Sequence, residues 1–187
     1  MGSNVREDVM AAARRAAQSH GYTGLNFREL AAEVGIKSAT IHYYFPTKVD
    51  LGAAIAKRYW EDAQTVLNAL WDGGADPARA LKSYPDTFRR SLEHDNRICL
   101  CSFMSAEHDD LPEPVQQEVA AFADVNIAWL KRILSAATDL DDAASERRAR
   151  AIFAAVAGAQ LMARSRSDIS VFDALIDGYR EAGLLPG

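Results

Sequence analysis

Four large ring side chains follow one another at residues 42–45, in the order His-Tyr-Tyr-Phe. At 100° per residue along a helix, Ile41 and Phe45 share one face. His42 and Tyr43 then point away from that face. A phenol can donate to a phosphate, and threonine and histidine side chains can contact base edges. The outward face is therefore poor core, and its chemistry suits a nucleic acid.

Two short helices joined by a glycine turn are expected to position these side chains. Asn26, with Glu29 three positions later, predicts a capping box at the start of the first helix, which Gly35 ends. The second helix is expected over residues 38–44, beginning at Lys37 or Ser38. Two short helices joined by a turn containing glycine form the helix-turn-helix arrangement.

A helical period of apolar residues recurs along the chain, and no segment reads convincingly as a strand. Thr47 with Asp50, and Ser170 with Asp173, predict further capping boxes. The fold class is therefore predicted as all-α, with a helix-turn-helix head (1–50) and a ligand-binding and dimerisation body (51–187). The roughly nine expected helices cover approximately residues 4–20, 27–34, 38–44, 48–70, 77–94, 97–109, 112–137, 143–164 and 170–183.

The net charge of −5 is unevenly distributed. Residues 1–60 carry eight Lys/Arg and five Asp/Glu, a net charge of +3, whereas the remaining 127 residues carry 13 basic and 21 acidic side chains, a net charge of −8. A basic head on an acidic body indicates that the head alone meets a polyanion. Two cysteines, no long apolar run and no apolar leader favour a cytoplasmic protein without a membrane partner.

From about Arg6 to Leu51 the sequence resembles the DNA-binding domain of the tetracycline-repressor (TetR) family. The resemblance lies in the pair Gly21-Tyr22, the helix at residues 27–31, the turn Gly35-Ile36 and the ending Tyr-Phe-Pro-Thr-Lys at residues 44–48. Two positions depart from the commonest family form, because Lys37 replaces a frequent serine and His42 a frequent tyrosine. The resemblance implies that the DNA surface contains Arg28, Lys37, Ser38, Ala39, Thr40, His42, Tyr43, Tyr44 and Lys48.

The body resembles the C-terminal domains of one TetR-family subgroup more loosely, chiefly at residues 97–108. In the family this region walls a cavity for a small inducer, here expected to be apolar and lightly functionalised. Each candidate wall residue could instead belong to the hydrophobic core and contact no ligand. The candidates are Trp60, Gln64, Phe88, Cys99, Cys101, Phe103, Met104, His108, Phe122 and Trp129.

The segment at residues 151–163 is rich in small side chains, which would let another helix approach closely. TetR-family proteins pair their last two helices from two subunits into a four-helix bundle, and such a homodimer would double the base contacts on a palindromic site. The alternative is a helix packed inside its own subunit. The expected interface residues are Ala151, Ala155, Gly158, Ala159, Met162, Phe172, Leu175 and Tyr179.

Together these expectations predict a DNA-binding transcriptional regulator. It would be a repressor that a small-molecule inducer releases from a palindromic operator. Competing readings are a metal site or redox sensor at Cys99 and Cys101, a helical adaptor that binds only protein, and an enzyme. However, side chains at i and i+2 point to different helix faces. The four histidines form no catalytic spacing, and GxSxG, Walker and HExxH motifs are absent. We therefore expect no enzyme, no metal and no cofactor.

Overall fold

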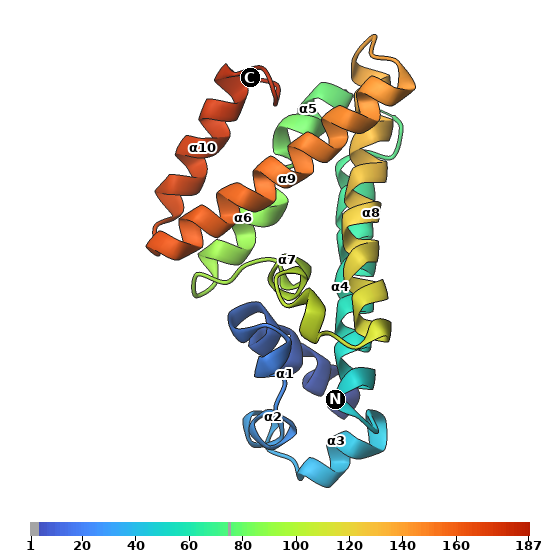
Figure 1. Ribbon diagram of the computed structural model, residues 1–187, viewed down its shortest axis with the longest axis vertical. Helices are drawn as coiled ribbons and strands as arrows, with labels where there is room; N and C mark the ends of the chain where they lie inside the picture. The colour runs from blue at the N-terminus through green and yellow to red at the C-terminus, as the bar shows by residue number, and fades with distance from the viewer. Residues whose placement is uncertain (1–3, 75) are drawn as a thin grey trace. The chain divides into compact units, whose positions relative to one another are not determined.

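The computed structural model describes residues 4–74 and 76–187, and all regular structure within them is helical (Figure 1). This confirms the predicted all-α fold class. Every helix in the described ranges is too short or too polar to traverse a bilayer. The helices are α1 (Val5–His20), η1 (Tyr22–Gly24), α2 (Phe27–Val34), α3 (Ser38–Tyr44), α4 (Lys48–Leu70), α5 (Pro77–Ser83), α6 (Asp86–Glu93), α7 (Leu100–Ser105), η2 (His108–Asp110), α8 (Glu113–Ala137), α9 (Asp142–Arg166) and α10 (Ile169–Glu181).

Local side-chain chemistry fixes the starts of the helices around the candidate site. The Asn26 side chain accepts the backbone N–H groups of Arg28 and Glu29 at the start of α2. At the start of α4, the Thr47 N–H donates to Asp50 Oδ2 over 2.9 Å, and the Asp50 N–H donates to Thr47 Oγ1 over 3.2 Å. The predicted capping box at Thr47 and Asp50 is therefore present in both directions. At Asn26 only the N-cap half is present, because the Asn26 backbone N–H donates to the Gly24 carbonyl and Glu29 accepts from the Asn26 side-chain amide over 3.2 Å. The caps satisfy N–H groups that lack a partner within the helix.

The segment expected as one helix over residues 77–94 forms two helices. α5 ends at Ser83, α6 begins at Asp86, and Pro85 lies between them. Proline has no N–H to donate, and its ring clashes with the carbonyl four residues earlier, so a helix breaks there. The expected helix over residues 97–109 is likewise shorter, because α7 ends at Ser105 and a turn leads into η2.

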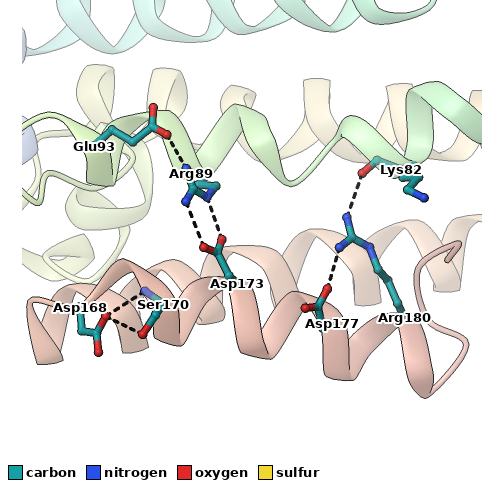
Figure 2. A network of polar contacts seen from close by, with 8 residues as sticks. All are labelled: Lys82, Arg89, Glu93, Asp168, Ser170, Asp173, Asp177 and Arg180. Atoms are coloured by element: carbon teal, nitrogen blue, oxygen red, sulfur yellow. Dashed lines mark hydrogen bonds and ion pairs between the residues drawn. The ribbon is translucent and has the colours of Figure 1, made fainter.

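The start of α10 also differs from the prediction. Asp168 is the N-cap, and its carboxylate accepts the Ser170 backbone N–H over 2.9 Å and the Ser170 hydroxyl over 2.7 Å (Figure 2). The predicted capping box of Ser170 with Asp173 is therefore wrong. Figure 2 shows the Asp173 carboxylate paired with Arg89 of α6 instead, with 2.7 Å between Arg89 Nε and Asp173 Oδ1.

The chain divides into two compact units. The first comprises the N-terminal residues through Trp60 together with Leu100–Phe122, and the second comprises Glu61–Cys99 and Ala123–Gly187. In the first unit, α1 packs against α2, α3 and α7. In the second, α9 packs along α10 and against α6 (Figure 1). The functional boundary at residue 50 stays a prediction.

Candidate nucleic-acid interface

Helix α3 has one buried face and one exposed face. Ile41 and Phe45 are buried in the core of the first unit. On the opposite side, 82% of the Tyr43 surface and 36% of the Tyr44 surface are exposed, and the two rings meet edge to face with centroids 5.1 Å apart. Tyr43 is therefore too exposed to be a residue of the hydrophobic core. It is a large planar hydrogen-bonding group presented to solvent.

His42 is also exposed, but two neighbours hold its ring. The ring packs against Phe27 of α2 with centroids 4.7 Å apart and an interplanar angle of 54°. Its Nδ1 lies 3.2 Å from the carbonyl oxygen of Pro46, just beyond the end of α3. Ala39 is exposed beside it, and Ser38 and Thr40 are half-buried. The predicted outward residues of α3 are therefore all at least partly exposed.

The basic side chains of the head differ in their partners. Arg15 pairs with Glu33 over 2.6 Å, and Arg58 pairs with Glu7 over 3.0 Å. Within residues 4–74 and 76–187, the exposed Arg28 and Lys37 form no ion pair. These two cations, one in the first turn of α2 and one at the N-cap of α3, therefore keep their charge available to an external anion.

Lys48 is arranged differently from the other predicted contacts. It is half-buried, and its Nζ lies 4.5 Å from the centroid of the Tyr22 ring. The same ring presses on α4, since a Cβ added at Gly52 would lie 2.7 Å from a Tyr22 ring carbon. Burial raises the pKa of Tyr22 above its ordinary value. Tyr22 therefore supports the first turns of α4 and the cation that they carry.

A carboxylate from a distant part of the sequence fastens the turn that contains Tyr22. Glu107, between α7 and η2, accepts the Tyr22 backbone N–H over 2.6 Å. Gly21 permits this approach, because it has φ = +68° and a Cβ there would lie 2.3 Å from Glu107 Oε2. Sequence reasoning missed Glu107, since nothing local links residues 85 positions apart. The strict glycine requirement at Gly21 was the available signal.

Comparisons with known proteins agree with this arrangement. Residues 9–55 match the family described as "Bacterial regulatory proteins, tetR family". A TetR transcriptional regulator from Legionella pneumophila has a TM-score of 0.90 at 26% identity, over 97% of this chain and 98% of that one. A TetR-family regulator from Agrobacterium tumefaciens has a TM-score of 0.87 at 26% identity, over 95% and 96%.

Residues 9–55 of the chain belong to the TetR family, and the whole chain has the fold of TetR-family regulators. It is similar at full length to an uncharacterized HTH-type transcriptional regulator in the lacX 3′ region of Lactococcus lactis subsp. lactis, with 24% identity over 96% of this chain and 95% of that protein. As a TetR-family protein it is a DNA-binding transcriptional regulator, and the matched segment contains the helix-turn-helix formed by α2 and α3.

The predicted ligand-contact residues of this TetR-family protein fall in both compact units. In the second unit, Tyr84 brings two of them together, because its ring stacks on Trp129 with centroids 5.8 Å apart and contacts Phe88 at 5.9 Å. In the first unit, Phe122 contacts Tyr59 at 5.4 Å, and Trp60 Nε1 donates to Glu118 Oε2 over 2.7 Å. Six are buried (Phe88, Cys99, Cys101, Met104, Phe122 and Trp129), Trp60 and Phe103 are half-buried, and Gln64 and His108 are exposed.

Two buried amides in the second unit were not foreseen. Gln160 of α9 is fully buried, accepts the Cys99 N–H over 2.9 Å and donates to the Phe88 carbonyl over 2.6 Å. Asn126 of α8 accepts the Tyr84 hydroxyl over 3.0 Å. Burial raises the pKa of Tyr84 well above its ordinary value, and ionisation of the nearby Cys99 would raise it further. A lone glutamine in an alanine-rich helix was the available signal for such a bridge.

Both cysteines are buried thiols. Across the described ranges, three or more His, Cys, Asp or Glu side chains nowhere gather closely enough to hold a metal ion. His94, at the C-cap of α6, places its Nδ1 2.8 Å from the Arg90 carbonyl oxygen.

The predicted interface residues of α9 and α10 are not all equally exposed. Ala159 and Phe172 are buried within the protomer. Ala151 is exposed and 49% of the Met162 surface is exposed, as is 48% of the neighbouring Leu161. Ala155, Gly158, Leu175 and Tyr179 are half-buried. An apolar strip therefore remains open to solvent along α9.

Proposed function

We propose that this TetR-family protein is a homodimeric repressor that binds a palindromic operator through α3 and leaves it when a small apolar molecule binds the body. The exposed face of α3 carries this proposal. Tyr43 is 82% exposed there, with His42 beside it. Arg28 and Lys37 add charges that no described acid neutralises. Phenol, imidazole and cations on one short helix pair match the mixture of phosphate and base contacts that operator binding requires.

The α9 strip supports the homodimer. Leu161 and Met162 leave about half their surface in water, and nothing lies within 4 Å of a Cβ added at Gly158 or Gly178. Backbones of two helices approach closely only where side chains are small, and exposed apolar patches on soluble proteins mark association sites. Two protomers paired in this way would present two copies of α3, about one DNA turn (~34 Å) apart.

The aromatic residues of the body support a small-molecule site. Phe88 and Trp129, whose rings both contact Tyr84 in the second unit, are buried, apolar and polarisable, as residues of ligand sites between bundle helices commonly are. Helix α4 continues from the head into the body sequence, so a ligand-dependent change in α4 would displace α3 from the operator. Ligand and DNA would then oppose each other with a coupling of roughly 1–3 kcal/mol, which is reciprocal by thermodynamic linkage.

Fluorescence anisotropy with labelled DNA from upstream of the protein's own gene tests the proposal. We expect tight binding that random duplex DNA of equal length does not displace. The log of the affinity should fall linearly with the log of the salt concentration, because Arg28 and Lys37 release counterions from phosphates. Absence of binding at low salt would contradict operator binding. An apolar compound library screened for loss of anisotropy then tests the inducer.

A further inference from the structure

The contacts of His42 determine which ring nitrogen carries its hydrogen. Nδ1 lies 3.2 Å from the Pro46 carbonyl oxygen. A carbonyl only accepts hydrogen bonds, so Nδ1 must be the donor of this pair. A neutral imidazole has a single N–H, and its second nitrogen is then an acceptor. For the neutral ring the tautomer is thus assigned from the bonding partner, and it leaves Nε2 as a lone-pair acceptor.

The same neighbours fix the position of the ring. Phe27 packs against it from α2 at a centroid separation of 4.7 Å, and Pro46 holds it from the segment after α3. The His42 residue is nevertheless exposed. A side chain held in place before binding loses less conformational freedom when it contacts DNA.

A neutral acceptor is a poor partner for phosphate, whose oxygens are acceptors as well. Tyr43, Arg28 and Lys37 carry the donors and charges that phosphates require. His42 is therefore better suited to a base edge than to the DNA backbone.

We propose that His42 determines operator specificity by accepting a hydrogen bond from an exocyclic amino group in the major groove, the N6 amine of adenine or the N4 amine of cytosine. These two amines are the donors on the major-groove edges, whereas guanine O6 and thymine O4 are acceptors. Every base pair holds one amino base and one keto base. The preference therefore selects which strand carries the amino base at one position of each half-site. The inference rests on the operator binding proposed above.

The test is selection of binding sites from a randomised duplex library by the wild-type protein and by His42→Phe. Phenylalanine keeps a ring against Phe27 and lacks both nitrogens. The wild-type half-site should show one position with adenine or cytosine on a given strand, favoured over guanine or thymine by roughly tenfold. His42→Phe should lose that preference and retain those at the other positions.

A base analogue tests the contact without relying on the variant alone. At the selected position, purine in place of adenine, or 2-pyrimidinone in place of cytosine, removes the amine. We expect it to weaken wild-type binding by roughly tenfold. His42→Phe should bind both duplexes equally, which corrects for any change in the duplex itself.

The outcomes separate this inference from operator binding. If the wild-type protein and His42→Phe select the same site with the same preferences, the inference is overturned. Operator binding is then left intact. A His42-dependent preference for guanine or thymine also overturns it, because Nε2 would then be the donor. A wild-type protein that selects no site contradicts operator binding, and the inference falls with it.

Discussion

The exposed surfaces of α3 and α9 contrast in chemistry although both face solvent. The α3 surface carries a phenol, an imidazole and, from its N-cap, a cation, all able to form directional bonds. The α9 surface carries Ala, Gly, Leu161 and Met162, which offer area but few hydrogen-bonding groups. The first surface suits a charged polymer, and the second suits another apolar protein surface. Their exposure identifies both surfaces as candidate binding sites. The chemistry of the side chains indicates that each binds a different kind of partner.

The largest effect is expected from Tyr43→Ala. If the phenol contacts a phosphate in each half-site, two hydrogen bonds to charged groups are lost, about 1.5–3 kcal/mol each, so operator binding should be abolished in a mobility-shift titration. Helicity and dimerisation should be unchanged, because Tyr43 contributes little to the core. His20→Ala, at an exposed position of α1, is the matched control. Unchanged operator affinity of the Tyr43 variant would show that the α3 face is assigned wrongly.

Gly158→Trp probes the α9 surface in the same way. A Cβ at Gly158 meets nothing within 4 Å in the protomer, so the variant should fold. In a two-fold interface the indole appears twice, and overpacking costs about 1–3 kcal/mol at each copy. Sedimentation should therefore report monomers at micromolar concentration. Ala120→Trp, on the exposed side of α8, should leave the mass unchanged. An intact dimer in both variants would remove α9 from the interface.

A smaller effect is expected from variants of Glu107. These variants test the stability of the head and not its contact with DNA. Glu107→Ala leaves the half-buried Tyr22 N–H without its acceptor, so the free energy of unfolding should fall by about 1–3 kcal/mol. Glu107→Gln keeps an acceptor oxygen and should lose less. Chemical denaturation measures both, and faster hydrogen exchange at the Tyr22 amide locates the change.

Asp110→Ala, at an exposed carboxylate of η2, is the control for charge. Equal unfolding free energies for wild type and Glu107→Ala would show that the turn at Gly21 holds without the carboxylate.

Much of the α3 surface could be predicted because its determinants are local. A rotation of 100° per residue separates Ile41 and Phe45 from Tyr43, and the caps at Asn26 and Thr47 involve residues two or three positions apart. Competition between local signals caused the error at α10, where Asp168 caps the helix in place of Ser170. The DNA-contact, ligand-contact and interface assignments stay predictions.

Contacts between distant segments could not be read from the sequence. Glu107 reaches Tyr22 across 85 positions, and Gln160 reaches Phe88 across 72. Such pairs depend on the packing of whole helices, which periodicity does not specify. The same limit applies to Lys48, whose place over the Tyr22 ring depends on how η1 meets α4.

The smallest effect concerns the ion pair that fastens α10 to α6. The hydrogen bond from Arg89 holds the pKa of Asp173 below its ordinary value, in spite of partial desolvation. A carboxylate whose folded pKa is depressed stabilises the protein above its unfolded pKa, near 3.9, and loses that contribution as the pH falls through the folded pKa. Asp173→Asn should therefore lower the unfolding free energy at pH 7, and the difference should shrink below about pH 4.

Solvent limits the size of this contribution, because 46% of the Asp173 side chain is exposed. Screening of such pairs leaves about 0.5–1 kcal/mol at pH 7. Urea denaturation at pH 7 and at about pH 2.5 measures the change, with Asp177→Asn as the control, since Asp177 pairs with Arg180 within α10 itself. A difference between Asp173→Asn and wild type that persists undiminished in acid would assign the contribution of Asp173 to packing.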